Sequence, residues 1–308
     1  MNKKILSLAI AAAVAAPMAA QADVSVNGAL SMDMYQDSTA AGGSGGLTGS
    51  DAGTSKVEFN VKSGNSFAKY AMALNKTIAD GSSPGTREAQ AGINVGGFNL
   101  TIARQANAYN MGVKVDTMTA NFLEARNRAG GVSKVPSFVN GLIGVSGSAG
   151  DVKYNVQYGP AYATGSTLTN PVLAGVQFKA GPATIGLGYY GDHLGNASSG
   201  VSAKMKFGDI AVAASFESAD GYWTAGGGGN DTTLGTAGAG SAQSIIFVDA
   251  SMPVGSGTIG LGLGQNTTQS TTFSRLSYQM KVDAGTVTFG GSNADGDTRI
   301  GAGIKVSF

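Results

Sequence analysis

Apolar and polar residues alternate with a period of two in many short segments of this chain. In the segment 201–207, VSAKMKF, four apolar residues alternate with a serine and two lysines. The same alternation recurs at 24–34, 57–61, 152–158 and 276–282. Such segments are typical of β-strands that present one apolar and one polar face.

The connections between these segments alternate between short and long. Counting strands between the connections gives 16, with both ends of the mature chain on the short-turn side. The long connections include 37–54, 105–136 and 220–241. The short ones contain Gly, Asn, Asp or Pro, as tight turns do, and are Ser63–Asn65, Gly96–Gly97, Ser148–Asp151, Ala180–Pro182, Gly208–Asp209, Pro253–Gly257 and Asp283–Gly285.

Composition excludes several other classes of protein. The chain has 49 glycines in 308 residues, but no Gly-x-y period, so it is not a collagen. An apolar content of 42% argues against disorder. The formal net charge of +1 argues against a nucleic-acid binder. No cysteine is present, so no disulfide can form.

The first 22 residues are predicted to be a secretory signal peptide. They combine two lysines, an apolar stretch from Ile5 to about Ala16, and the small-x-small sequence Ala20-Gln21-Ala22. We therefore expect two parts, a signal peptide at 1–22 and a mature domain at 23–308. After residue 22, no apolar run approaches the roughly 18 residues of a transmembrane helix.

Charged residues in the predicted strands share the parity of the polar face. A soluble β-sandwich would show the same division of charges between its faces. The exported context and the even strand number therefore decide between a soluble sandwich and a membrane-spanning barrel. Only structures with fully paired backbones span a membrane, and a closed barrel satisfies this. The sequence therefore predicts an all-β, antiparallel, up-and-down transmembrane β-barrel with a water-filled interior. Its lumen-facing charges are Asp33, Lys56, Glu58, Lys62, Lys69, Glu88, Lys153, Lys179, Lys204, Lys206, Glu217, Asp249, Arg275, Lys281, Arg299 and Lys305.

The last strand resembles the closing strand of the bacterial outer-membrane general porins. It reads TRIGAGIKVSF, alternates strictly, and ends in Phe308. In that family the terminal strand carries a polar-x-Gly-x-x-aromatic-x-aromatic signal that the barrel-assembly machinery reads. Gly303 and Phe308 match it, whereas Val306 and Gly301 stand where an aromatic and a polar residue are usual. The resemblance extends to the layout of the mature chain and implies a homotrimer embedded in outer-membrane lipid.

The third long connection, from about Gln105 to Pro136, is the candidate functional segment. Connections of this length are usually functional, and the resemblance implies that this one folds into the lumen and narrows it. The segment TMTANFLEAR predicts a short helix that starts near Thr117 or Thr119. The family's usual loop sequence Pro-Glu-Phe-Gly-Gly is absent.

In the family, acids on this loop face basic residues on the barrel wall. The resemblance therefore implies a pore constriction lined by charged residues from the two sides. The loop candidates are Asp116, Glu124, Arg126 and Arg128, and the wall candidates are Lys56, Lys62, Lys69, Arg299 and Lys305. Basic residues outnumber acids on the lumenal parity, which predicts a weak preference for anions.

The sequence offers little for catalysis or cofactor binding. GLGYYG at 186–191 matches the dinucleotide pattern G-x-G-x-x-G, but it continues an alternating strand instead of opening a helix. His193 is the single histidine, and the chain has no cysteine to join it in a zinc site. We expect no enzyme, no cofactor and no metal.

These features predict a passive channel for ions and small hydrophilic solutes in the outer membrane of a Gram-negative bacterium. Two alternatives remain. A substrate-specific channel would carry a row of aromatic residues along the constriction, and few aromatics have the lumenal parity. A non-conducting surface or adhesive β-barrel would give no stepwise current in a planar bilayer.

Overall fold

In the structure, a computed structural model, the residues described lie almost entirely in antiparallel strands. The structure describes residues 22–37, 48–50, 55–73, 85–106, 108–115, 117, 138–160, 170–191, 197–220, 243–268, 270–283, 285–294 and 297–308. Among these residues no helix is long and apolar enough to cross a membrane. The elements are β1 (Asp23–Asp37), β2 (Thr48–Ser50), β3 (Lys56–Ser63), β4 (Ser66–Ala73), β5 (Gly85–Val95), β6 (Phe98–Ala106), α3 (Ala108–Val113), β7 (Phe138–Ala149), β8 (Val152–Tyr158), β9 (Val172–Ala180), β10 (Ala183–Gly191), β11 (Ala197–Phe207), β12 (Ile210–Asp220), β13 (Gln243–Val254), β14 (Gly257–Asn266), β15 (Thr271–Val282), β16 (Gly285–Ala294) and β17 (Asp297–Ser307).

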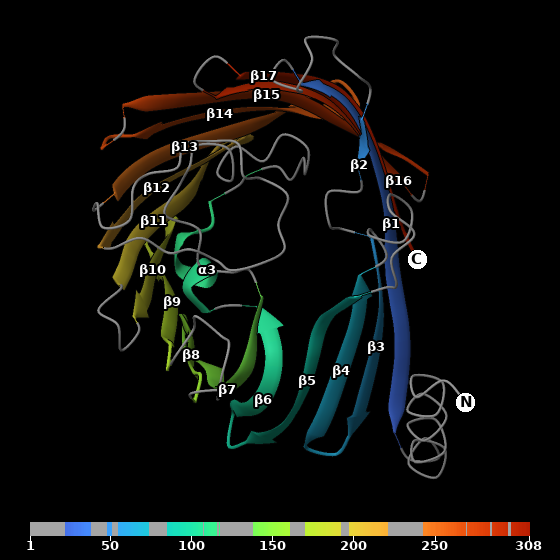
Figure 1. Ribbon diagram of the computed structural model, residues 1–308, viewed down its shortest axis with the longest axis vertical. Helices are drawn as coiled ribbons and strands as arrows, with labels where there is room; N and C mark the ends of the chain where they lie inside the picture. Colours follow the sequence, from blue (N-terminus) through green and yellow to red (C-terminus); the bar gives the residue numbers. More distant parts are fainter. Residues whose placement is uncertain are drawn as a thin grey trace.

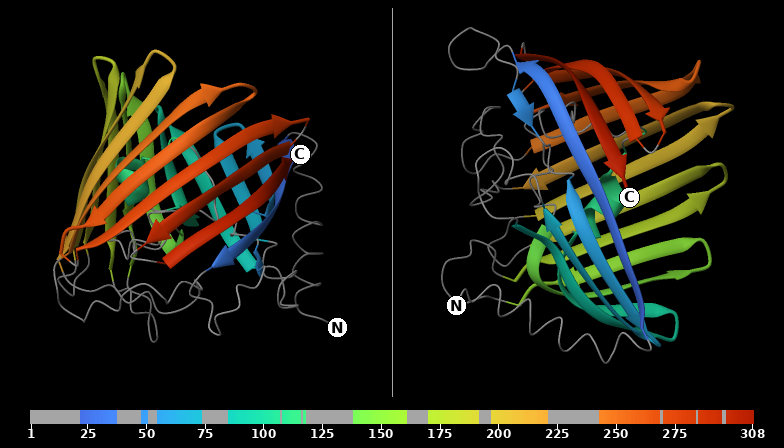
Figure 2. Two further views of the ribbon diagram at one scale, coloured as in Figure 1. Left: turned by 90° about the horizontal axis from the view of Figure 1, so that it is seen from above. Right: turned by 90° about the vertical axis from the view of Figure 1, so that its right-hand side faces the viewer.

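The strands close into one barrel (Figures 1 and 2). Each strand from β3 to β17 pairs with its neighbour in the chain, and β17 returns to pair with β1. Both β2 and β3 pair with β1, at Tyr35–Thr48 and Ala29–Lys56 among others, so together they form one interrupted barrel strand. The wall therefore has 16 strands, which confirms the predicted fold class.

All seven short connections predicted from the sequence are two-residue turns. Their closing pairs include Ser63–Ser66, Val95–Phe98 and Ala180–Ala183. A positive φ at the first turn residue suits the right-handed twist of a hairpin, and glycine adopts it without a steric penalty. Glycine occupies that place in six of the turns, and Asp283, with φ 48°, occupies it in the seventh. The left view of Figure 2 shows these turns gathered at one end of the barrel.

The two faces of the wall differ as the alternation predicts. The exposed large hydrophobic residues have the outward parity; examples are Ile102, Leu187 and Leu276. Side chains of the opposite parity, such as Gln157 and Asp249, face the interior. Because lipid cannot hydrate a charge, a lysine or arginine on the outer face at the bilayer midplane would cost about 2–4 kcal/mol.

The alternation fails at two positions, and the structure gives the reason. Arg87 and Arg104 are the charged strand residues whose parity matches the apolar face. A register shift places Ala71 opposite Glu88 and Met72 opposite Thr86, so Arg87 is an extra residue in the β4–β5 ladder. A second shift follows Ala103 in the β6–β7 ladder, next to Arg104. β-Bulges of this kind interrupt the period of two, so parity does not assign a face to either arginine.

The terminal residue closes the seam between the last strand and the first. The amide of Phe308 donates to the carbonyl oxygen of Gly28 at 3.0 Å, and the amide of Gly28 donates to the carbonyl oxygen of Phe308 at 2.8 Å. A Cβ on Gly28 would lie 2.2 Å from Cζ of Phe308, so the phenyl ring covers the glycine directly. An aromatic ring across a strand protects the bare backbone of a glycine from solvent and fixes the register.

A double-mutant cycle tests this contact. Gly28→Ala displaces the ring and Phe308→Ala removes it, so each change alone should lower the free energy of unfolding of the barrel in lipid bilayers. Since both remove one contact, the double variant should lose about 0.5–1.5 kcal/mol less than the sum. Phe289→Ala, which removes another outward ring, should add to Gly28→Ala without coupling. Strict additivity of Gly28→Ala and Phe308→Ala would contradict the contact.

Candidate functional site

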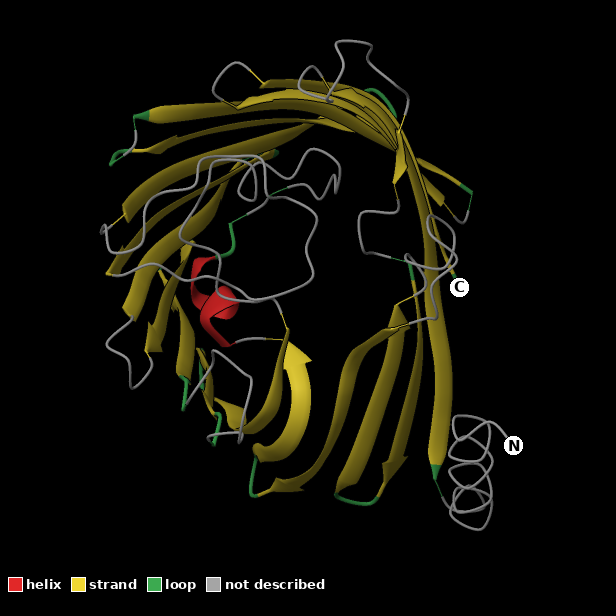
Figure 3. Cartoon of the chain, in the orientation of Figure 1, coloured by secondary structure: helices red, strands yellow, loops and turns green. Residues whose placement is uncertain are grey.

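A short helix, α3, lies inside the barrel against its wall (Figures 1 and 3). It directly follows β6 and begins the third long connection, so the predicted entry of this connection into the lumen is seen for residues 108–115 and 117. Its apolar side chains join wall residues in one buried cluster: Ala108, Tyr109, Val113, Leu142, Leu173 and Tyr190. The buried helix positions 108, 109, 112 and 113 form one face, as expected for a helix that packs on a sheet.

Glycines in the wall make room for the helix backbone. A Cβ on Gly175 would lie 2.0 Å from the carbonyl oxygen of Ala108, and one on Gly186 would lie 2.3 Å from that of Gly112. A Cβ on Gly188 would lie 2.7 Å from the carbonyl oxygen of Tyr109. These glycines therefore permit a close backbone approach. Gly175, Gly186 and Gly188 together form what we call the glycine seat of α3. Two of them are the G-x-G of GLGYYG, which lies within strand β10 and does not open a helix.

Polar side chains of the wall bind the backbone of the helix. Gln157 accepts from the amide of Ala108 at 2.8 Å and donates to the carbonyl oxygen of Ala106 at 2.9 Å. Gln177 donates to the carbonyl oxygen of Met111 at 2.5 Å, and Ser202 donates to that of Gly112 at 2.6 Å. Backbone groups at the ends of a helix lack partners within it, so the wall supplies them.

Two acidic residues of the wall hold the helix and the residues after it. The Tyr109 hydroxyl donates to Oε2 of the buried Glu217 at 2.8 Å. Asp249 accepts from the amide and the hydroxyl of Thr117 at 2.6 and 2.8 Å, and from Nη2 of Arg275 at 2.6 Å. Both Asp249 and Arg275 are almost fully buried. Hydrogen bonds to charged groups are stronger than neutral ones, so this part of the connection is firmly attached to β12 and β13.

A second charged group lies on β3, β4 and β5, on the other side of the lumen from α3 (Figure 1). Lys56 and Lys69 contact Glu58, with N–O distances of 2.6 and 3.1 Å, and Lys69 also contacts Glu88. Two lysines and two glutamates make this patch electrically balanced. The predicted wall bases Lys56 and Lys69 are therefore paired with wall acids beside them.

The other predicted site residues are placed as follows. Lys62 and Lys305 are exposed on the lumenal parity near the short-turn end. Arg299 lies on β17 opposite Ser292 and Asp37. Asp116, Glu124, Arg126 and Arg128 lie outside the described residues, as does the helix expected near Thr117 beyond that residue.

Sequence reasoning missed the seat of the helix. Glu217 and Asp249 were identified as lumenal acids, but their role in holding α3 was not. The available signal was glycine on the lumenal parity of neighbouring strands, at 175, 186, 188 and 200. A period-two pattern with glycine on its polar face marks a wall that another segment can approach.

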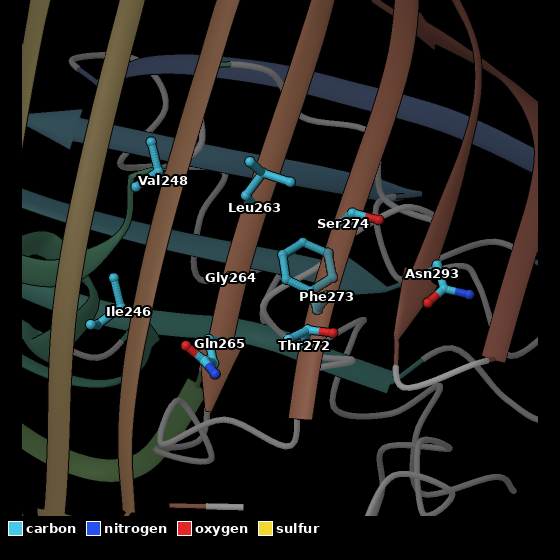
Figure 4. Close-up of a pocket in the computed structure, with 9 residues that line it drawn as sticks. All are labelled: Ile246, Val248, Leu263, Gly264, Gln265, Thr272, Phe273, Ser274 and Asn293. Carbon is cyan, nitrogen blue, oxygen red and sulfur yellow. The ribbon is translucent and has the colours of Figure 1, made fainter. Parts of the chain in front are cut away.

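A surface hollow lies elsewhere on the wall, near the long-loop ends of β13–β16 (Figure 4). Its lining includes Ile246, Val248 and Leu263, which have the outward parity. Gly264, which has no side chain, lies beside Phe273 at its base. The hollow is thus a feature of the outer surface and not of the lumen.

A closed barrel with an apolar exterior, a charged interior and a chain segment seated in its lumen defines the class of outer-membrane channels. The family model of the Gram-negative porins matches residues 7–299, so the chain belongs to that family. It is a passive diffusion channel of the outer membrane. A comparison with curated proteins found no match.

Solved structures share the fold at low sequence identity. A loop-deletion mutant of OmpT, an outer-membrane protein of Vibrio cholerae, superimposes with a TM-score of 0.69 at 14% identity, over 94% of this chain and 100% of that one. The anion-selective porin of Comamonas acidovorans gives 0.69 at 14%, over 93% and 100%. A mutant of the Rh. blastica porin gives 0.68 at 15%, over 93% and 100%.

The glycine seat makes a specific prediction. Gly186→Ala puts a methyl group against the backbone of Gly112 and should push α3 away from the wall. Because α3 occupies part of the lumen, single-channel conductance should change and become more variable between openings. The control, Gly291→Ala, has the outward parity, opposite Leu276 and Ile300, so its methyl group lies away from the lumen and should leave conductance unaltered. Identical channels from both variants would contradict the seat.

Proposed function

We propose that this porin is a general diffusion channel for ions and small hydrophilic solutes, narrowed by α3 and the adjoining part of the third connection. The observation that carries the proposal is the attachment of α3 to the inner wall by glycine contacts and by the side chains of Gln157, Gln177, Ser202 and Glu217. Transport of this kind requires a hydrated path and no covalent chemistry.

The distribution of aromatic residues favours a general channel over a sugar-specific one. Tyr190, Phe247 and Phe273, which have the lumenal parity, are buried, and so is Tyr109 of α3. Phe67, on the lumenal parity of β4, is half-buried. The exposed aromatic side chains of the described strands have the outward parity. In the part of the chain that the structure describes, the lumen therefore lacks the row of accessible rings on which a sugar would stack.

We further propose that the channel prefers anions. Among the described lumenal acids, Glu58, Glu88, Glu217 and Asp249 all bind a lysine, an arginine or a tyrosine. Several lumenal lysines have no such acid beside them. A lumen with excess positive charge raises the local concentration of anions.

Measurement of the reversal potential across a planar bilayer with a tenfold KCl gradient tests both proposals. Stepwise current is expected, with a reversal potential of the sign given by chloride. Cation preference would refute the charge argument but leave the channel intact. Absence of stepwise current would refute the channel itself and favour a surface or adhesive role.

Constriction residues on the loop remain part of the proposal. Asp116, Glu124, Arg126 and Arg128 are proposed to face the lumen, with Lys56, Lys62, Lys69, Arg299 and Lys305 on the wall. The support is the family membership together with the seating of residues 108–115 inside the barrel. We expect no enzymatic activity and no cofactor.

We also propose that residues 1–22 are removed and that the mature chain forms a homotrimer. One neighbouring structure, OmpT of Vibrio cholerae, is described as a trimer form. The strand β17, with Gly303, Val306 and Phe308, is proposed to serve as the signal for the barrel-assembly machinery. Native mass spectrometry of protein extracted from outer membranes should give three times the mass of a chain that starts at Asp23. The mass of a single chain would contradict the homotrimer. A mass that includes residues 1–22 would contradict removal of the signal peptide.

A further inference from the structure

Six lysines occupy matching places at the short-turn end of the barrel. For five of them, one strand residue separates the lysine from a two-residue turn. The sixth lies two residues before the end of β17. All six have the lumenal parity, all are exposed, and in the described residues none makes an ion pair. They are Lys62, Lys153, Lys179, Lys206, Lys281 and Lys305.

The pairing of the strands brings these lysines into one rim. Lys281 and Lys305 are both register partners of Thr286, from opposite sides of β16. Lys153, Lys179 and Lys206 come from β8, β9 and β11, the part of the wall that holds α3. On β9, the first lumenal residue beyond Gln177, which binds α3, is Lys179. Lys153, Lys179 and Lys206 thus lie between α3 and the short-turn opening.

Acidic residues at this end only partly balance the lysines. Asp23 is the register partner of Lys62, and the turns contribute Asp151, Asp209 and Asp283. None of these four makes an ion pair in the described part of the chain. Six lysines exceed the four aspartates and the carboxylate of Phe308, so the rim is positive. Deeper in the lumen, by contrast, Lys56, Lys69 and Arg275 are paired with acids.

We propose that this rim of lysines is the anion-selecting element of the channel and a binding site for small multivalent anions at its periplasmic opening. The inference rests on the proposed channel function and adds the place and the ligand class. Short turns face the periplasm in outer-membrane barrels. Fixed charge at one opening makes that opening electrically different from the other.

The reach of the rim depends on salt. Exposed charges act over a Debye length, about 10 Å at 0.1 M and about 3 Å at 1 M ionic strength. At low salt the fields of neighbouring lysines overlap, so a multivalent anion can bind several of them at once. At high salt each lysine is screened separately, so selection and binding both weaken.

The block of single channels by tripolyphosphate tests the proposal. A chemical label determines independently which way the channel faces in the bilayer. Because the chain has no cysteine, Asn65→Cys places one thiol in a short turn, where a membrane-impermeant maleimide added from one side reports which opening faces that chamber. The test variant carries Lys153→Gln, Lys179→Gln and Lys206→Gln. The matched control carries Lys→Arg at the same positions and keeps the charge.

At 0.1 M KCl, tripolyphosphate should block the unaltered channel at lower concentration from the short-turn side than from the other side. The glutamine variant should need about tenfold more tripolyphosphate from the short-turn side for the same block. In a tenfold KCl gradient its reversal potential should move toward zero, while the arginine control should behave as the original in both measurements. At 1 M KCl all three should converge, with equal conductance showing that the glutamine variant is folded.

Two results would overturn the inference while leaving the proposed channel standing: equal block from both sides, or equal block of the original and glutamine channels. In either case the anion preference would have to come from charges deeper in the lumen. Failure of the unaltered protein to conduct would instead overturn the proposed function, and the rim with it.

Discussion

Hydrocarbon provides no hydrogen bonds, and the architecture of this protein follows from that constraint. Every backbone amide and carbonyl that crosses the membrane needs a partner in the protein, and a sheet satisfies this only if its first and last strands pair. Here β1 serves both neighbours: its first half pairs with β3, and its second half pairs with β17 and β2. The carboxyl-terminal residue completes the seam at Gly28.

Because the barrel is closed, the inner face of its wall contacts water and does not have to be apolar. Strands that hydrogen-bond to one another on both sides can carry any residue toward water, and the lumen of this barrel uses the freedom in two ways. From β8 to β13, glycine, glutamine, serine and acidic residues receive α3 and the chain that follows it. From β3 to β5, a balanced group of lysines and glutamates lies on the other side of the lumen from α3.

Charge is distributed unevenly along the axis of the barrel. Basic residues deep in the wall, such as Lys69 and Arg275, stand beside acids, which lowers the penalty for placing a charge in a partly desolvated site. Lysines at the short-turn end are exposed to water and need no such partner. Basic residues thus differ at the two depths: they pair with acids in the wall and face water at the short-turn end.

The sequence by itself determined the strand count, the seven short turns, the two faces of the wall and the closing role of Phe308. These features depend on the period of two and on turn chemistry, which are local. Only the tertiary structure showed that α3 begins at Ala108, that Gly186 and Gly188 receive it, and that Glu58 and Glu88 pair with Lys56 and Lys69. It also showed that β-bulges explain Arg87 and Arg104. Those contacts join residues far apart in the chain or depend on the exact register between strands, and the alternation of a single strand carries no information about what lies across the lumen.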